Sequence, residues 1–126
     1  MLSRVVDDEP LANFVLEENK FKPDGVHWRA FRPGSDGERS VFRVQDLCDE
    51  YIAATGQAFV GNLRDKQILG WARLSASAVR AGTPLLARPD VPPPRHAVIV
   101  GWPSEKERQK ALAMLLASRA TARRWP

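Results

Sequence analysis

Several features that would restrict the location or the fold of a protein are missing from this sequence. A single cysteine, Cys48, occurs among the 126 residues, so the chain cannot form an internal disulfide bond. No apolar run approaches the ~20 residues that a membrane-spanning helix needs. The acidic stretch at residues 7–9 stands where a signal peptide would be apolar. These absences favour a protein of the reducing cytoplasm that has no contact with a membrane.

The motifs of the common enzyme classes are missing as well. The two histidines, His27 and His96, have no second histidine at the short spacings that metal sites use. The chain contains no glycine-rich phosphate loop, serine elbow, Cys-x-x-Cys or His-Glu-x-x-His pattern. We therefore expect no cofactor, no metal site and no catalytic residue of these classes. The sequence favours a protein that is not an enzyme, and enzymes without such motifs remain open.

Charge is distributed unevenly along the chain. Residues 1–50 hold 7 basic and 11 acidic residues, a net charge of −4, whereas residues 51–126 hold 12 and 4, a net charge of +8. Arginine accounts for 14 of the 19 basic residues, and its planar guanidinium suits carboxylates and phosphates. Three interpretations remain open: complementarity within the chain, head-to-tail association, or a basic face for an acidic partner.

The clearest local structure lies near the end of the chain. The apolar, β-branched run at residues 97–100 predicts a strand that is buried on both faces. Gly101 and Pro103 then predict a tight corner. Ser104 and Glu107 have the spacing of a capping box, which predicts a long helix from Ser104 to about residue 123.

The rest of the chain predicts short elements. We expect strands at residues 2–6 and 11–16, and a β-hairpin with strands at 26–32 and 40–44. Asp46 and Ser75 are expected to cap two short helices that end near Gly56 and Gly82, with a loop at 59–65 between them. Short strands at 68–72 and 83–87 precede a polyproline-like connection at 88–95.

These elements do not alternate regularly between strand and helix, so they predict an α+β fold. We expect one domain over residues 1–126, with a small mixed or antiparallel sheet, two short helices and one long C-terminal helix packed on one face.

Three functions are compatible with these residues. The first, which we favour, is a non-catalytic protein-interaction subunit whose aromatic and charged anchors include Trp71, Trp102 and Arg95. The second is a nucleic-acid-binding module that uses the basic second half. In addition, Arg29 and Arg43 of the hairpin predicted at residues 26–44 are interleaved with aromatic residues, an arrangement that suits stacked bases and phosphates. The third is a small hydrolase or transferase.

The third function would use His96 and His27 together with an acid such as Asp7 or Glu9. It requires the two imidazoles to meet at an open pocket. The candidate binding residues are therefore His96, Trp102, Arg95, Trp71, His27, Arg29 and Arg43.

The stretch from His96 to Pro103 resembles that of a group of uncharacterised small bacterial proteins that carry the pattern H-A-x-[IV]-V-G-W-P. Upstream segments at residues 29–31, 40–43 and 78–82 are also similar to that group, so the resemblance covers most of residues 9–117. It implies an intact domain in the bacterial cytoplasm that serves as a subunit or regulator of a larger protein partner. No catalytic residue is implied by this resemblance.

Overall fold

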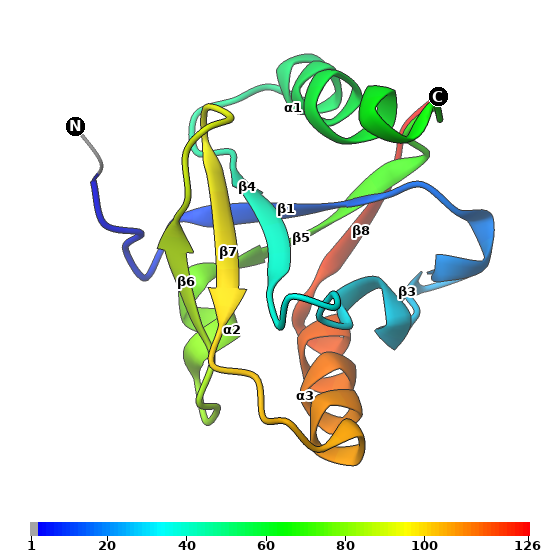
Figure 1. Ribbon diagram of the computed structural model, residues 1–126. Helices are drawn as coiled ribbons and strands as arrows, with labels where there is room; N and C mark the ends of the chain where they lie inside the picture. Colours follow the sequence, from blue (N-terminus) through cyan, green and yellow to red (C-terminus); the bar gives the residue numbers. More distant parts are fainter. Residues whose placement is uncertain (1–2) are drawn as a thin grey trace.

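A six-stranded antiparallel sheet is the frame of the computed structural model, which describes residues 3–126 (Figure 1). In spatial order its strands are β6 (Leu86–Pro89), β7 (His96–Val100), β4 (Arg39–Arg43), β1 (Pro10–Val15), β5 (Gly70–Ser75) and β8 (Thr121–Arg124). A separate ribbon pairs β2 (Phe21–Lys22) with β3 (Gly25–Val26). The helices are α1 (Asp49–Gly56), α2 (Ala76–Arg80) and α3 (Lys106–Arg119). The predicted α+β class with a long C-terminal helix is confirmed.

Both faces of the sheet are covered, because alternate residues of a strand point to opposite sides. Along β1, Leu11 and Val15 join one buried cluster, while Ala12 and Phe14 join the other. The first cluster is covered by α2, α3 and a 3-10 turn at Trp28–Phe31. The second is covered by α1 and the π-helical turn that follows it, Gln57–Gly61. Figure 1 shows α1 and α3 on opposite sides of β1.

The predicted buried strand is β7, which lies between β4 and β6. Its three central residues, 97–99, are at most 3% exposed. At the following corner Gly101 has a φ of +95°, and an added Cβ would lie 2.3 Å from the carbonyl oxygen of Pro84. Glycine is required there for both reasons. The corner leads to α3, which packs on the Trp28–Phe31 turn and β5.

The predicted bounds of the last helix are wrong at both ends. The residue that precedes the first turn is Glu105, which makes no side-chain capping bond, so Ser104 and Glu107 form no capping box. Gln109 instead donates from its amide to the carbonyl oxygen of Pro103 at 2.7 Å. The helix ends at Arg119 because residues 121–124 form β8, whose backbone groups pair with β5.

The predicted hairpin over residues 26–44 is wrong as well. Residues 28–31 form a 3-10 turn, in which the His27 imidazole accepts a hydrogen bond from Arg29 N. The partners of β4 are β1 and β7, which are distant in sequence. Consecutive burial of Ala30 and Phe31, at 3% and 0% exposure, shows that this segment does not alternate between two faces.

Other short elements also differ from the sequence predictions. Residues 3–6 form no strand, and residue 2 of that predicted strand lies outside the described residues. The predicted loop at 59–65 is largely helical. The Gln57 side chain accepts a hydrogen bond from Ile68 N and donates one to Lys66 O, which stabilises this segment. Asp46 has a φ of +64° and does not cap α1, which begins after Cys48. The cap at Ser75 is confirmed, since its hydroxyl accepts from Ala78 N at 3.1 Å.

Within residues 3–126, none of the helices has the length and the apolar composition that crossing a membrane would require.

Candidate functional site

The two oppositely charged halves of the chain complement each other. Arg88 pairs with Glu38 at 3.1 Å, and Arg123 pairs with Asp49 at 2.9 Å. Two further pairs join the halves in the same way, Arg80 with Asp7 and Arg124 with Glu18. Each pair is largely exposed and contributes little to stability. Together they pair four of the twelve basic residues of the second half with acidic residues of the first half.

A cleft opens where β1 and β4 separate. Their ladder consists of Leu11 opposite Arg43 and Ala12 opposite Phe42, and it ends there in the described chain. Because Arg43 N donates to Arg95 O, the odd-numbered residues of β4 direct their backbone groups toward β7 and the even-numbered ones toward β1. Ser40 therefore directs its N–H toward β1, beyond the last paired residues of the ladder.

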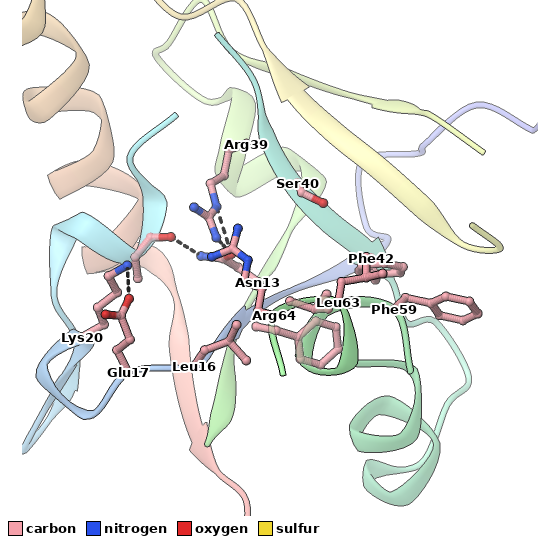
Figure 2. A pocket seen from close by; sticks show the side chains of 13 residues that line it. Asn13, Leu16, Glu17, Lys20, Arg39, Ser40, Phe42, Phe59, Leu63 and Arg64 are labelled. Carbon is pink, nitrogen blue, oxygen red and sulfur yellow. Dashed lines mark hydrogen bonds and ion pairs between the residues drawn. The ribbon is translucent and has the colours of Figure 1, made fainter. Parts of the chain in front are cut away.

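This space, which we call the basic cleft, has a volume of about 210 Å³. Its polar lining consists of Asn13, Glu17, Lys20, Arg39, Ser40 and Arg64. Figure 2 shows these side chains around the cleft.

Arg39 is the central cation of the basic cleft. Its guanidinium donates from Nε and Nη2 to the Asn13 side-chain oxygen, at 3.1 and 3.0 Å, and Nη1 lies 3.4 Å from Arg32 O. Asn13 is completely buried and donates to Ala30 O at 2.6 Å, so its orientation is fixed. Since a guanidinium carries five N–H donors, Arg39 keeps two of them unbonded.

Arg39 is a partly buried cation that has no carboxylate partner in the described chain. Among the described residues, neither Arg39 nor its cationic neighbours Arg32 and Arg64 has an acidic group within 4.0 Å. Removal from water, together with repulsion by Arg64 and Arg32, lowers the pKa of Arg39 to about 10. The side chain is still protonated at neutral pH. Glu17 also lines the cleft and pairs with Lys20, so Arg39 and Arg64 leave the lining with a net positive charge.

A second, apolar hollow adjoins the basic cleft. We call it the proline hollow; its volume is about 570 Å³, and it is lined by Ser40, Phe42, Phe59, Leu63, His96 and the prolines at 92–94. Ser40, Phe42, Phe59 and Leu63 line both spaces. Leu63 is 82% exposed, which is uncommon for a leucine that has an apolar surface beside it. One continuous surface therefore places cationic and apolar groups side by side.

Three polar residues, Ser40, His96 and Asp90, are joined by close contacts that begin at Ser40, which lines both spaces. The hydroxyl of Ser40 is 2.5 Å from His96 Nε2, across the ladder between β4 and β7. His96 Nδ1 is 2.7 Å from the backbone oxygen of Asp90 and 3.4 Å from its carboxylate. A carbonyl oxygen can only accept, so Nδ1 carries the proton and Nε2 accepts from the Ser40 hydroxyl. We call Ser40, His96 and Asp90 the serine triad.

The candidate residues from the sequence do not meet at one place. His96, Arg95 and Arg43 line a common hollow of about 400 Å³. Arg43, however, is already engaged, because it forms a two-pronged ion pair with Glu9, a side chain that is only 4% exposed. Burial acts to raise the pKa of Glu9, but the hydrogen bonds from Arg43 and Val6 N outweigh it, so that pKa is lowered.

His27 and Arg29 lie elsewhere on the molecule. His27 lines a hollow beside α3 that has no lining residue in common with the two hollows that His96 lines. Loss of water and the nearby cations Arg29, Lys22 and Lys110 lower the pKa of His27. Asp7 and Glu9 are occupied by Arg80 and Arg43. The structure therefore does not assemble the two-histidine site that the third hypothesis requires.

The two candidate tryptophans are integrated into the fold. Trp71 is 1% exposed and packs against Phe14 and Trp125, so it does not reach the surface. Trp102 is half-buried, and its indole N–H donates to the carbonyl oxygen of Ile99 at 3.0 Å. Neither side chain is presented as an anchor for a partner.

The sequence interpretation missed Asn13, Arg39, Ser40, Arg64 and Asp90. Asn13 gave one readable signal, because a polar side chain inside an apolar strand must find a buried partner. The others become neighbours only through strand pairing: Ser40 and His96 are 56 residues apart in sequence.

No cluster of three or more His, Cys, Asp or Glu side chains suited to a metal ion occurs between residues 3 and 126. No family model, curated protein or solved structure matches the chain, so its function is inferred from the chemistry of its own residues.

Proposed function

We propose that this chain is a protein-interaction module that binds an acidic segment of a larger partner. The observation that carries the proposal is the basic cleft, where Arg39 lies beside Arg64 and Arg32 with no carboxylate of the described chain within 4.0 Å. Repulsion among these cations destabilises the empty cleft. An aspartate or glutamate side chain of a partner would relieve that repulsion.

The donors of the basic cleft suit a carboxylate. Arg39 keeps two N–H groups after bonding Asn13 and Arg32 O, and Ser40, whose N–H is directed toward β1, lines the same cleft. Hydrogen bonds between charged groups contribute about 1.5–3 kcal/mol each. Because Asn13 already fixes the guanidinium, little side-chain freedom is lost when the partner binds.

The proline hollow supplies the second half of the recognition. Its lining is mostly apolar, and Phe59 and Leu63 line both this hollow and the basic cleft. Burial of one large apolar side chain in such a hollow contributes about 1.5–3 kcal/mol. The partner segment we propose therefore carries an acidic residue near an apolar one.

Nucleic acid is the less favoured ligand. Phosphate binding along a strand needs a continuous basic groove. Here four arginines of the basic half are paired with acids of the other half, so part of its positive charge is already engaged within the fold. The bacterial cytoplasmic setting, which the single cysteine and the resemblance of the His96 region support, is part of the same proposal.

A peptide array tests this function. The probes are acetylated, amidated octapeptides that carry one glutamate and one leucine at varied spacing, and the best binder is then titrated by fluorescence anisotropy. We expect Arg39→Gln to weaken that binding by about tenfold or more, since about 1.4 kcal/mol corresponds to a tenfold change. The matched control is Arg73→Gln, which removes an exposed arginine outside both spaces and should change affinity less than about twofold.

Two results would overturn the proposal. In the first, no octapeptide binds, or both variants weaken binding equally, which would show that only net charge matters. In the second, single-stranded oligothymidylate binds more tightly than any peptide and loses affinity steeply as salt rises, which would identify a nucleic-acid-binding module instead.

A further inference from the structure

The serine triad has the order of groups that activates a hydroxyl. Ser40 is an exposed residue whose Oγ is 2.5 Å from His96 Nε2, and His96 Nδ1 is held by Asp90. The Asp90 backbone oxygen fixes the tautomer in which Nε2 has a free lone pair. That lone pair can accept the Ser40 proton, which is the role of a general base.

We propose that Ser40 is the nucleophile of an acyl-transfer site, with His96 as general base and Asp90 as the residue that positions it. The substrate class is a carboxylic ester whose acyl group is apolar. The proline hollow begins at Ser40 and His96 themselves and continues over Phe42 and Phe59, so an acyl chain bound there brings its carbonyl carbon to the Ser40 hydroxyl.

The basic cleft shares Ser40 with the proline hollow, and we assign to it the stabilisation of the oxygen that becomes negative. The Ser40 N–H is directed toward β1, and Arg39 and Arg64 line the same cleft and supply positive charge there. Donors arranged in advance around a developing oxyanion are commonly the largest contribution to catalysis of acyl transfer. The hydroxyl that His96 activates and the cationic lining of the basic cleft thus meet at Ser40.

The reaction balances within these groups. His96 Nε2 takes the Ser40 proton while Oγ forms a bond with the ester carbonyl carbon, and the bond to the alcohol oxygen breaks as the imidazolium returns that proton to the leaving alcohol. Water then enters, gives a proton to His96 and attacks the acyl carbon. The acid is released when the Oγ–carbon bond breaks and His96 returns the proton to Ser40.

Substitution of the Asp90 side chain should slow the reaction less than substitution of His96. The tautomer of His96 is set mainly by the Asp90 backbone oxygen at 2.7 Å, which a side-chain substitution leaves in place. The carboxylate is farther away, at 3.4 Å, and its side chain is 51% exposed. Asp90→Asn should therefore reduce the reaction less than tenfold, whereas His96→Gln should reduce it by about a hundredfold or more.

This inference rests on the proposed function only for the cations that assist the oxyanion. The serine triad itself does not include Arg39. A protein that fails to bind acidic peptides can still have a reactive Ser40, and a protein that binds them can have an inert one, so the two failures are distinguishable.

The test is covalent labelling of the whole chain with an alkyl fluorophosphonate, followed by intact-mass measurement and peptide mapping. We expect one added label on Ser40, none in Ser40→Ala, and unchanged labelling in Ser104→Ala, the matched control at another exposed serine. His96→Gln should label about a hundredfold more slowly, and the near-ultraviolet circular dichroism of each variant confirms that it is folded.

A thiol variant keeps the proposal testable if the alkyl fluorophosphonate reacts slowly. In a Cys48→Ser background, Ser40→Cys should be alkylated by iodoacetamide about tenfold faster with His96 present than in the His96→Gln variant. The proposal is overturned if folded wild-type protein carries no label on Ser40 and the thiol reacts equally fast with and without the imidazole. In that case the contact between Ser40 and His96 is a structural cross-strand pair.

Discussion

Two arginines on the same side of β4 offer a sharp comparison, because they differ in what neutralises them. Arg43 forms a two-pronged pair with the buried carboxylate of Glu9. Arg39 bonds only to neutral oxygens. If the charge of Arg39 serves to bind a ligand, its removal should lower the free energy of unfolding of the ligand-free protein only slightly. Arg39→Gln and Arg43→Gln therefore make a matched pair of variants.

The expected magnitudes follow from the two environments. The fall in the pKa of Arg39 from an ordinary value of about 12.5 to about 10 means that its charge costs the fold about 3 kcal/mol. The Arg39→Gln substitution would remove this cost, and the new amide could still donate to Asn13, while packing of the arginine stem worth about 1 kcal/mol would be lost. The free energy of unfolding of this variant should therefore lie within about 1 kcal/mol of wild type, or above it. Arg43→Gln leaves a buried carboxylate unpaired and should cost about 3 kcal/mol.

Urea unfolding at neutral pH and low salt, followed by tryptophan fluorescence, measures both values in one experiment. We expect Arg39→Gln to be more stable than Arg43→Gln by at least about 2 kcal/mol. If the two variants lose equal stability, Arg39 is a structural cation like Arg43, and the argument that its charge awaits a ligand is refuted.

Three further predictions concern the fold. Acid should destabilise the protein below about pH 4.5, the ordinary pKa of a glutamate, because the pKa of Glu9 is lowered in the fold and its stabilisation disappears as the carboxylate is protonated. The urea midpoints at pH 6 and pH 3.5 should therefore differ less in Glu9→Gln than in wild type, and equal differences would contradict this prediction. Gly101→Ala should cost more than about 2 kcal/mol and Gly82→Ala about 1 kcal/mol, since both have positive φ but only Gly101 meets a backbone atom, at 2.3 Å; thermal melts that rank them the other way would show that this contact is easily relieved. Trp71→Ala should cost about 3–5 kcal/mol and Leu63→Ala under about 0.5 kcal/mol, because they are 1% and 82% exposed; similar losses in denaturant titrations would place Leu63 in the core.

Local signals in the sequence predicted the parts of the fold that local physics determines. The β-branched run of β7, the serine cap at Ser75 and the α+β order all follow from residues close together in the chain. The segment at residues 26–32 was misread because an apparent alternation of apolar residues also fits a 3-10 turn with two consecutive buried residues. Only packing against α3 and β1 distinguishes the strand interpretation from the 3-10 turn.

The candidate site could not be predicted because strand pairing creates it. Asn13 and Arg39 are 26 residues apart, and Ser40 and His96 are 56 apart, so no spacing rule relates them. The position of the basic cleft depends on where the ladder between β1 and β4 ends, and the sequence of neither strand shows that point. Charge counting was informative at a coarser level, since the opposite halves do pair within the chain.

The most direct measurement follows the side chain of Arg39 itself. Its Nε–Hε resonance can be assigned in a ¹⁵N NMR spectrum by comparison with Arg39→Gln and then followed while the best-binding acidic octapeptide is added. We expect this resonance to shift in a saturable manner, together with the backbone amide of Ser40, at a concentration that matches the anisotropy titration. Saturable binding that leaves both resonances unmoved, while signals elsewhere shift, would show that the partner binds another surface and would contradict the assignment of the basic cleft.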